Sequence, residues 1–134
     1  MHEAIILVGY FAANHSDNQT MVQSGMNVVE NSIILQIFLF FLDFNNFLFF
    51  LSILGHQPSV LQQLCNLPFP YFSQTNLREI LFPTLLACCH ENQENLVVLS
   101  QEMSWTLIDE YLKTPEGQKN ALVQLILMSS TSKK

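Results

Sequence analysis

The stretch ILFPTLLACCHENQENLV, residues 80–97, decides the fold that we predict, because the chain repeats its pattern. It places an apolar segment, a polar turn with a histidine and a second apolar segment in succession. The same succession occurs in IILVGYFAANHSDNQTMV, residues 5–22, at an offset of 75 residues (5 to 80). In this pairing His15 corresponds to His90. The two stretches therefore predict a repeated pair of helices joined by a short polar turn.

The other segments also show helical spacing of apolar residues. Ile5, Val8 and Ala12 form one stripe of the first helix, and Ile6, Gly9 and Ala13 lie beside it. Pro58 is expected at the first position of a helix, and Asn76 is expected to cap another. Nothing alternates strongly enough to require a strand, so we predict an all-α chain. The predicted helices not yet placed are residues 4–13, 18–24, 77–89, 96–112 and 121–128.

The segment FLFFLDFNNFLFF, residues 38–50, is the most apolar part of the chain. It lies within residues 33–54, from Ile33 to Leu54, which are long enough to cross a hydrocarbon core of about 30 Å. Asp43 opposes insertion, because a carboxylate at mid-span costs about 2.5–3.5 kcal/mol. A buried helix that is apolar on every side is a second interpretation, although a domain of this size has little with which to cover it.

A third interpretation comes from a resemblance. HQPSVLQQLCNLPFPYFS (56–73) and LREILFPTLLACCHENQENLVVLSQEMS (77–104) resemble the C-terminal region of the family of S-phase cyclin A-associated proteins of the endoplasmic reticulum. GYFAANHSDNQTMVQSG (9–25) resembles the segment just before it, and the resemblance is expected to end near Trp105. In that family the equivalents of Gly25 and His56 are nearly adjacent. The resemblance therefore implies that residues 26–55, from Met26 to Gly55, are an insertion.

The insertion brings the internal repeat into a familiar range. Removing it shortens the offset to about 45 residues, within the roughly 40–47 residues of armadillo and HEAT repeats. Its Phe-, Leu-, Ile- and Asn-rich composition suits A/T-rich codons, and its ends can be encoded by splice-site-like sequences. We interpret it as a retained intron translated in frame, with a transmembrane anchor at residues 33–54 as the alternative.

These observations predict an armadillo-like helical-repeat fragment of about two repeats, interrupted by the hydrophobic helix. Residues 1–25 and 56–128 would form the repeat domain, residues 26–55 the insert, and residues 129–134 a polar tail. Trp105 and Tyr111 are expected as core anchors.

Composition argues against several function classes. The net charge is −6 and no basic patch is present, so we expect no direct binding of nucleic acid. The four histidines and three cysteines lack metal-ligand spacing, and we find no nucleophile–base pair or phosphate-binding loop. We therefore predict a non-enzymatic chain without catalytic, cofactor-binding or metal-binding residues, and the sequence assigns no partner-binding residues. The cysteines are Cys65, Cys88 and Cys89.

The resemblance implies a function that composition does not give. It implies an adaptor or interaction module, a fragment of a scaffold linked to cell-cycle control and tubulin messenger regulation. Its partners would be proteins of ribosome- or cell-cycle-associated complexes. Its location would be cytoplasmic, at the endoplasmic reticulum membrane. The alternative is a small single-pass membrane protein anchored through Ile33 to Leu54, with its C-terminal half in the cytoplasm because all five cations follow the span.

Overall fold

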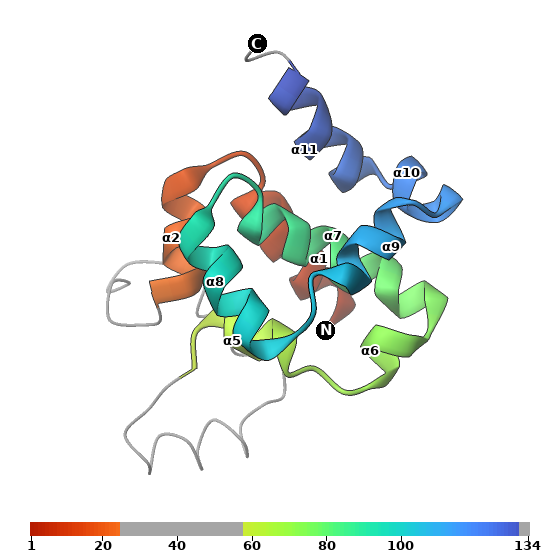
Figure 1. Cartoon of the computed structure of the whole chain (residues 1–134), viewed down its shortest axis with the longest axis horizontal. Helices are drawn as coiled ribbons and strands as arrows, with labels where there is room; N and C mark the ends of the chain where they lie inside the picture. The colour runs from red at the N-terminus through yellow and green to blue at the C-terminus, as the bar shows by residue number, and fades with distance from the viewer. Residues whose placement is uncertain (25–57, 132–134) are drawn as a thin grey trace.

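The computed structural model describes residues 1–24 and 58–131, and in these ranges all regular structure is helical (Figure 1). This confirms the all-α prediction. The predicted insert at residues 26–55 and the predicted span at residues 33–54 lie outside the described residues. None of the helices in the described ranges is long and apolar enough to cross a membrane. The helices are α1 (His2–Ala12), α2 (Ser16–Ser24), α5 (Val60–Cys65), α6 (Pro70–Ser73), α7 (Thr75–Cys89), α8 (Gln93–Glu102), α9 (Thr106–Leu112), α10 (Pro115–Lys119) and α11 (Ala121–Thr131).

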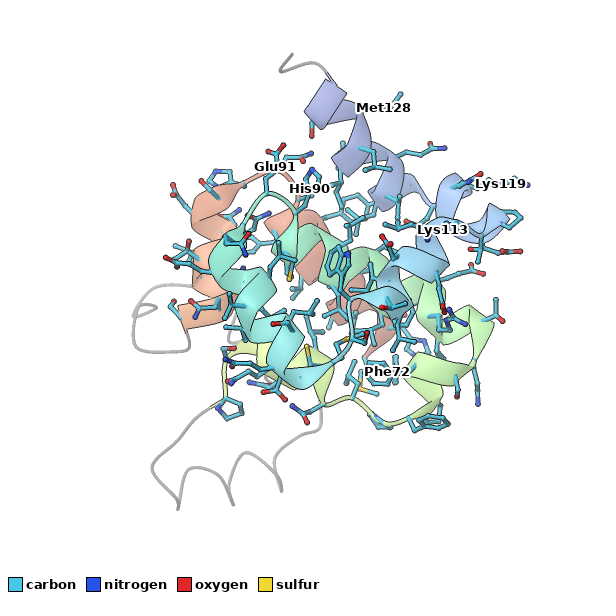
Figure 2. The ribbon with its side chains drawn as sticks, viewed as in Figure 1. Phe72, His90, Glu91, Lys113, Lys119 and Met128 are labelled. Carbon is cyan, nitrogen blue, oxygen red and sulfur yellow. The ribbon has the colours of Figure 1, made fainter. Side chains whose placement is uncertain are left out.

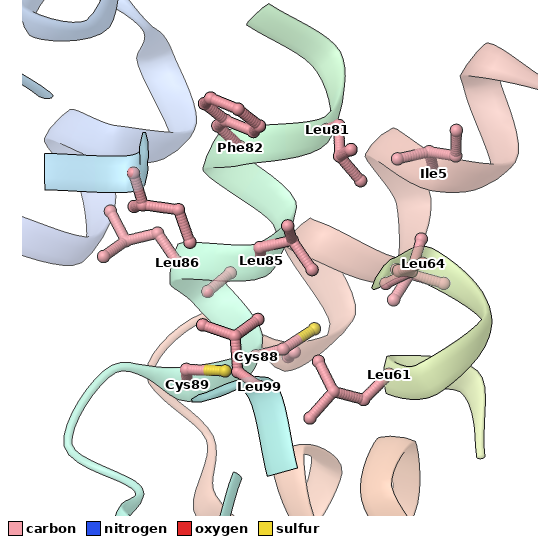
Figure 3. Close-up of a cluster of buried hydrophobic side chains, with 14 of the residues drawn as sticks. Ile5, Leu61, Leu64, Leu81, Phe82, Leu85, Leu86, Cys88, Cys89 and Leu99 are labelled. Carbon is pink, nitrogen blue, oxygen red and sulfur yellow. The ribbon is translucent and has the colours of Figure 1, made fainter. Parts of the chain in front are cut away.

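Helix α7 is the centre of the molecule, and α1 packs along it more extensively than any other helix does. The second half of α7 is buried on all sides, from Leu81 to Cys89. The predicted stripe of α1, with Ile5, Val8 and Ala12, faces it and is buried. Figure 3 shows the side chains of α7 meeting those of α1, α5 and α8 in one core. Residues before and after the undescribed segment therefore share one hydrophobic core.

The helix pairs α1–α2 and α7–α8 have the same turn. Ala13 and His90 end their helices with nearly equal dihedrals (φ −59°, ψ 120° and φ −63°, ψ 124°). The next residues, Asn14 and Glu91, both have left-handed backbones, with φ of 57° and 56°. The two pairs also lie against each other through α1–α7 and α2–α8 contacts. The predicted repeat of helix pairs is therefore present in the structure.

A side-chain bond repeats with the turn. Asn18 Nδ2 donates to the carbonyl of Phe11 at 2.6 Å, and Asn95 Nδ2 donates to the carbonyl of Cys88 at 2.7 Å, each across seven residues. The shared turn and the shared side-chain bond both require an offset of 77 residues between the repeats (18 to 95), in place of the predicted 75. The pairing of His15 with His90 is wrong, because His90 ends α7 whereas His15 immediately precedes α2. The wider armadillo-like architecture stays a prediction.

Several helix ends differ from the prediction. Pro58 precedes the helix and does not start it, because Ser59 is the N-cap of α5. Its Oγ accepts from the Gln62 backbone N–H at 3.2 Å, and Gln62 Oε1 accepts from the Ser59 N–H at 3.0 Å. Asn76 does not cap α7, which already begins at Thr75 directly after α6.

The predicted long helix at residues 96–112 is two helices. Helix α8 ends at Glu102, and the extended backbone of Met103 (φ −153°, ψ 161°) separates it from α9. Met103 and Trp105 lie partly buried against the core, so this break turns two large apolar side chains inward. The last helix continues to Thr131, beyond the predicted end at Met128.

Candidate protein-binding surface

Exposed apolar side chains gather on two helices, α1 and α11. On α1, Tyr10 is 49% exposed, and Ile6 and Leu7 are exposed beside it. On α11, Leu125 and Met128 are 46% and 71% exposed and follow the exposed Ala121 at spacings of four and three residues. This spacing places the three α11 residues on one face of the helix, which we call the α11 stripe. Figure 2 shows Met128 near the C-terminal end of α11.

A pocket of about 170 Å³ lies where α1, α7 and the start of α11 meet. Its walls are mostly apolar, but a carboxylate, an amide and a hydroxyl also reach it. The lining residues are Ile6, Tyr10, Glu79, Ile80, Pro83, Thr84, Asn120, Ala121 and Leu122. Since Ile6 and Tyr10 are also exposed on α1, and Ala121 begins the α11 stripe, the pocket and the stripe form one continuous surface, which we call the α1–α11 groove.

Pro83 accounts for a hydrogen bond that joins α7 to α11 beside the pocket. It lies inside α7 and has no N–H, so the carbonyl of Glu79, four residues earlier, lacks its helical donor. Asn120 Nδ2 donates to this carbonyl at 3.2 Å. The Oδ1 of the same residue accepts from the backbone N–H groups of Leu122 at 3.0 Å and Val123 at 3.3 Å, which caps the start of α11. One amide therefore joins the interrupted turn of α7 to α11.

A close approach of three helices forms the floor of the groove. A Cβ added at Gly9 would lie 2.5 Å from Leu122 Cδ2 and 2.7 Å from Thr84 Oγ1, so only glycine permits this spacing. Thr84 Oγ1 lies 3.0 Å from the carbonyl of Ile5, within hydrogen-bond distance. The position of α1 on α7 and α11 is therefore set by direct contact.

The second half of α11 is also bonded to the turn that follows α1. Asn14 Nδ2 donates to the carbonyl of Leu125 at 3.2 Å, and Ser129 Oγ donates to Asn14 Oδ1 at 2.7 Å. Together with Asn120, these bonds fix α11 at both ends. The α11 stripe is therefore held in a defined position beside Tyr10.

The groove has negative charge at the pocket. Glu79 lines the pocket and takes part in none of the ion pairs formed by the described residues. Its carboxylate acts on a neighbour: burial, and after it the charge of Glu79, raise the pKa of Tyr111 to about 12. The chain as a whole carries a net charge of −6, which also favours a cationic partner.

The pocket, at about 170 Å³, is too small for a cofactor or drug-sized ligand, since such pockets measure roughly 300–1,000 Å³. Its volume suits one large side chain of a binding partner. Among the described residues, no three His, Cys, Asp or Glu side chains are placed to bind a metal ion. The groove can therefore provide apolar contact and one negative charge, which are properties of a protein-binding surface.

The cysteines and aromatic residues singled out in the sequence do not line the pocket. Burial raises the pKa of Cys65 and Cys89 to about 12 and that of Cys88 well above its usual range, so these thiols are side chains of the core. Tyr111 is buried, as predicted for a core anchor, and Trp105 is only partly buried.

Sequence reasoning missed Tyr10, which is the aromatic residue of the groove. A signal for it was present, because Tyr10 falls outside the predicted stripe of α1 formed by Ile5, Val8 and Ala12. An aromatic residue off the buried stripe of a helix is a candidate for partner contact, since aromatic side chains are enriched at protein interfaces.

Comparison with known proteins gives one similarity. No protein-family model matches the chain, and no solved structure matches it. The chain is 38% identical over 124 residues to the human protein "S phase cyclin A-associated protein in the endoplasmic reticulum". The match covers 90% of this chain and 7% of the relative, so the chain corresponds to a small part of a much longer protein. Coverage of 90% requires the similarity to continue past Trp105, where the sequence was expected to depart from the family. Over nearly its whole length, this chain is similar to one segment of the S phase cyclin A-associated protein in the endoplasmic reticulum.

Proposed function

We propose that the chain is a non-enzymatic protein-interaction module with a scaffold-like role. The observation that carries the proposal is the α1–α11 groove, in which exposed apolar side chains are held in place by hydrogen bonds at both ends of α11. Contiguous exposed apolar surface on a folded domain commonly marks a site of protein contact. Rigidly positioned side chains favour binding further, because less conformational entropy is lost on association.

The similarity to a longer protein supports the finer parts of the proposal. The name of that relative states an association with cyclin A and a location in the endoplasmic reticulum. We propose by extension that this chain acts as an adaptor in the cytoplasm at the endoplasmic reticulum membrane. Its partners would be proteins of cell-cycle- or ribosome-associated complexes. An armadillo-like arrangement of about two repeats would suit this role, because helical repeats present extended binding surfaces.

Site-specific photo-cross-linking in cells tests the proposal. The full chain would carry a photo-reactive amino acid at Leu125 in the groove or, as the matched control, at Leu127, which is also 46% exposed but lies off the α11 stripe. We expect discrete adducts from position 125 that are weak or missing from position 127. The adduct from position 125 should also disappear when Tyr10→Asp is added. Equal adducts from both positions, or none from position 125, would refute the interaction role of the groove.

A further inference from the structure

We propose that the α1–α11 groove binds an amphipathic helix that inserts one apolar anchor into the pocket and places a lysine or arginine beside Glu79. This inference rests on the proposed function and specifies the class of partner. It combines the shape of the groove with the charge at its end.

The structure favours a helical partner over other peptide conformations. Strand addition needs an exposed sheet edge, and the described ranges contain only helices. Recognition of phosphorylated or acidic motifs needs clustered arginines, whereas the chain is acidic. Proline-rich peptides need a groove lined by aromatic rings, and Tyr10 is the only aromatic residue lining the pocket. A helix lying in an apolar groove is the recognition mode that remains.

The dimensions of the groove suit two turns of a helix. The α11 stripe runs from Ala121 to Met128, which corresponds to about 10 Å at 1.5 Å per residue. The pocket opens beside Ala121, at one end of the stripe. An apolar anchor in the pocket, followed by apolar residues four and seven positions along the partner helix, would cover the stripe.

Charge defines the chemistry beside the anchor. Glu79 lines the pocket, and none of the cations in the described part of the chain forms an ion pair with it. Arg78 lies over the ring of Phe82 at 5.2 Å, and Lys113 pairs with Asp109 at 3.6 Å. Lys119 is exposed and forms no ion pair with Glu79 among the described residues. A cationic side chain on the partner would complement the carboxylate and speed association with an acidic protein.

A display library of helical peptides tests the inference and does not require the natural partner to be identified. Peptides of about 18 residues are long enough to form helices in water. The library would be selected on the full chain and counter-selected on the Leu125→Asp variant. We expect enriched peptides to carry apolar residues at positions i, i+4 and i+7, with lysine or arginine one turn from the first. Failure to enrich any peptide, or enrichment of acidic or non-helical sequences, would overturn the inference.

Affinity measurements on one selected peptide then test each contact. By fluorescence anisotropy, we expect Leu125→Asp to weaken binding at least tenfold and Leu127→Asp to leave it unchanged. Glu79→Gln should weaken binding about two- to fivefold, as expected for a partly exposed ion pair. Circular dichroism checks that each variant stays folded. Equal loss from Leu125→Asp and Leu127→Asp, or no effect of Glu79→Gln, would contradict the assigned site.

The two proposals fail in different ways. If position 125 cross-links in cells but the selection yields no basic amphipathic helix, the interaction role stands and the class of partner is wrong. If position 125 gives no adduct and the selection also fails, both proposals are wrong.

Discussion

Replacing Asn95 by alanine should destabilise the fold strongly, because its amide caps a buried helix end. The last carbonyls of α7 have no donors within the helix. The carbonyls of Leu86 and Cys89 accept hydrogen bonds from backbone N–H groups of the following turn. The other two accept from side chains on neighbouring helices: Ala87 accepts from Gln19 Nε2 at 2.8 Å, and Cys88 accepts from Asn95 Nδ2 at 2.7 Å.

The size of the effect follows from the bonds that Asn95 makes. Its buried Nδ2 also donates to the carbonyl of Gln19 at 2.9 Å, so the amide joins α8 to both α7 and α2. Two hydrogen bonds contribute about 1–3 kcal/mol net, and the buried Cys88 carbonyl left without a donor costs about 1–3 kcal/mol more. We expect Asn95→Ala to lower the free energy of unfolding by about 3 kcal/mol, a large part of the roughly 5–15 kcal/mol typical of small domains.

Urea denaturation of the full chain, followed by far-ultraviolet circular dichroism, measures this loss. With a slope of about 2 kcal/mol per molar urea, the midpoint should fall by about 1.5 M. Ser100→Ala is the matched control on the exposed face of α8, with an expected change within about 0.5 kcal/mol. Asn95→Asp keeps the shape of the side chain but replaces the donor amide by an acceptor, and should cost at least as much as alanine. A loss below about 1 kcal/mol for Asn95→Ala, or a milder effect of Asn95→Asp, would refute the reasoning.

Two further predictions concern the buried thiols and the segment 26–55. The buried thiols should resist a disulfide reagent at pH 8 in the folded chain and react with it in urea. Because burial raises their pKa in the folded state, the free energy of unfolding should also fall as the pH rises from about 8.5, where unfolded thiols ionise, towards 12. A denaturation midpoint that stays constant across this pH range would contradict this linkage. Deleting residues 26–55 should leave the cooperativity of unfolding unchanged or increased, because α2 and α5, which flank this segment in the sequence, pack on each other. A less cooperative urea transition for the deletion variant would show that the insert belongs to the fold.

Much of the helical framework could be predicted from the sequence, because helix periodicity is a local property. The stripe with Ile5, Val8 and Ala12 was predicted from the helical spacing, and the structure buries it. The break at Met103 was not expected, because the apolar spacing continues across it. Only the packing of α8 and α9 on the core requires the chain to turn there.

The internal repeat was recognised, but its register was not. Matching histidines gave an offset of 75 residues, whereas the left-handed residues of the turns, Asn14 and Glu91, require 77. Backbone dihedrals define equivalent positions in a turn, and glutamate carries no sequence signal for a left-handed conformation. The repeated bond from Asn18 and from Asn95 to a carbonyl seven residues earlier depends on the fold of each turn, which the sequence does not specify.

The sequence by itself determined the helical class of this chain, the apolar stripe of its first helix and its similarity to a segment of a much longer protein. Each of these depends on residue order and spacing over short distances. Tertiary structure alone decided which apolar residues stay exposed and where the pocket lies. The Asn120 amide donates to the Glu79 carbonyl, 41 residues away in the sequence, which lacks its helical donor because of Pro83. Gly9 has no side chain and so allows Leu122 to pack against α1. Such pairings depend on how distant helices pack, and periodicity along the chain does not specify them.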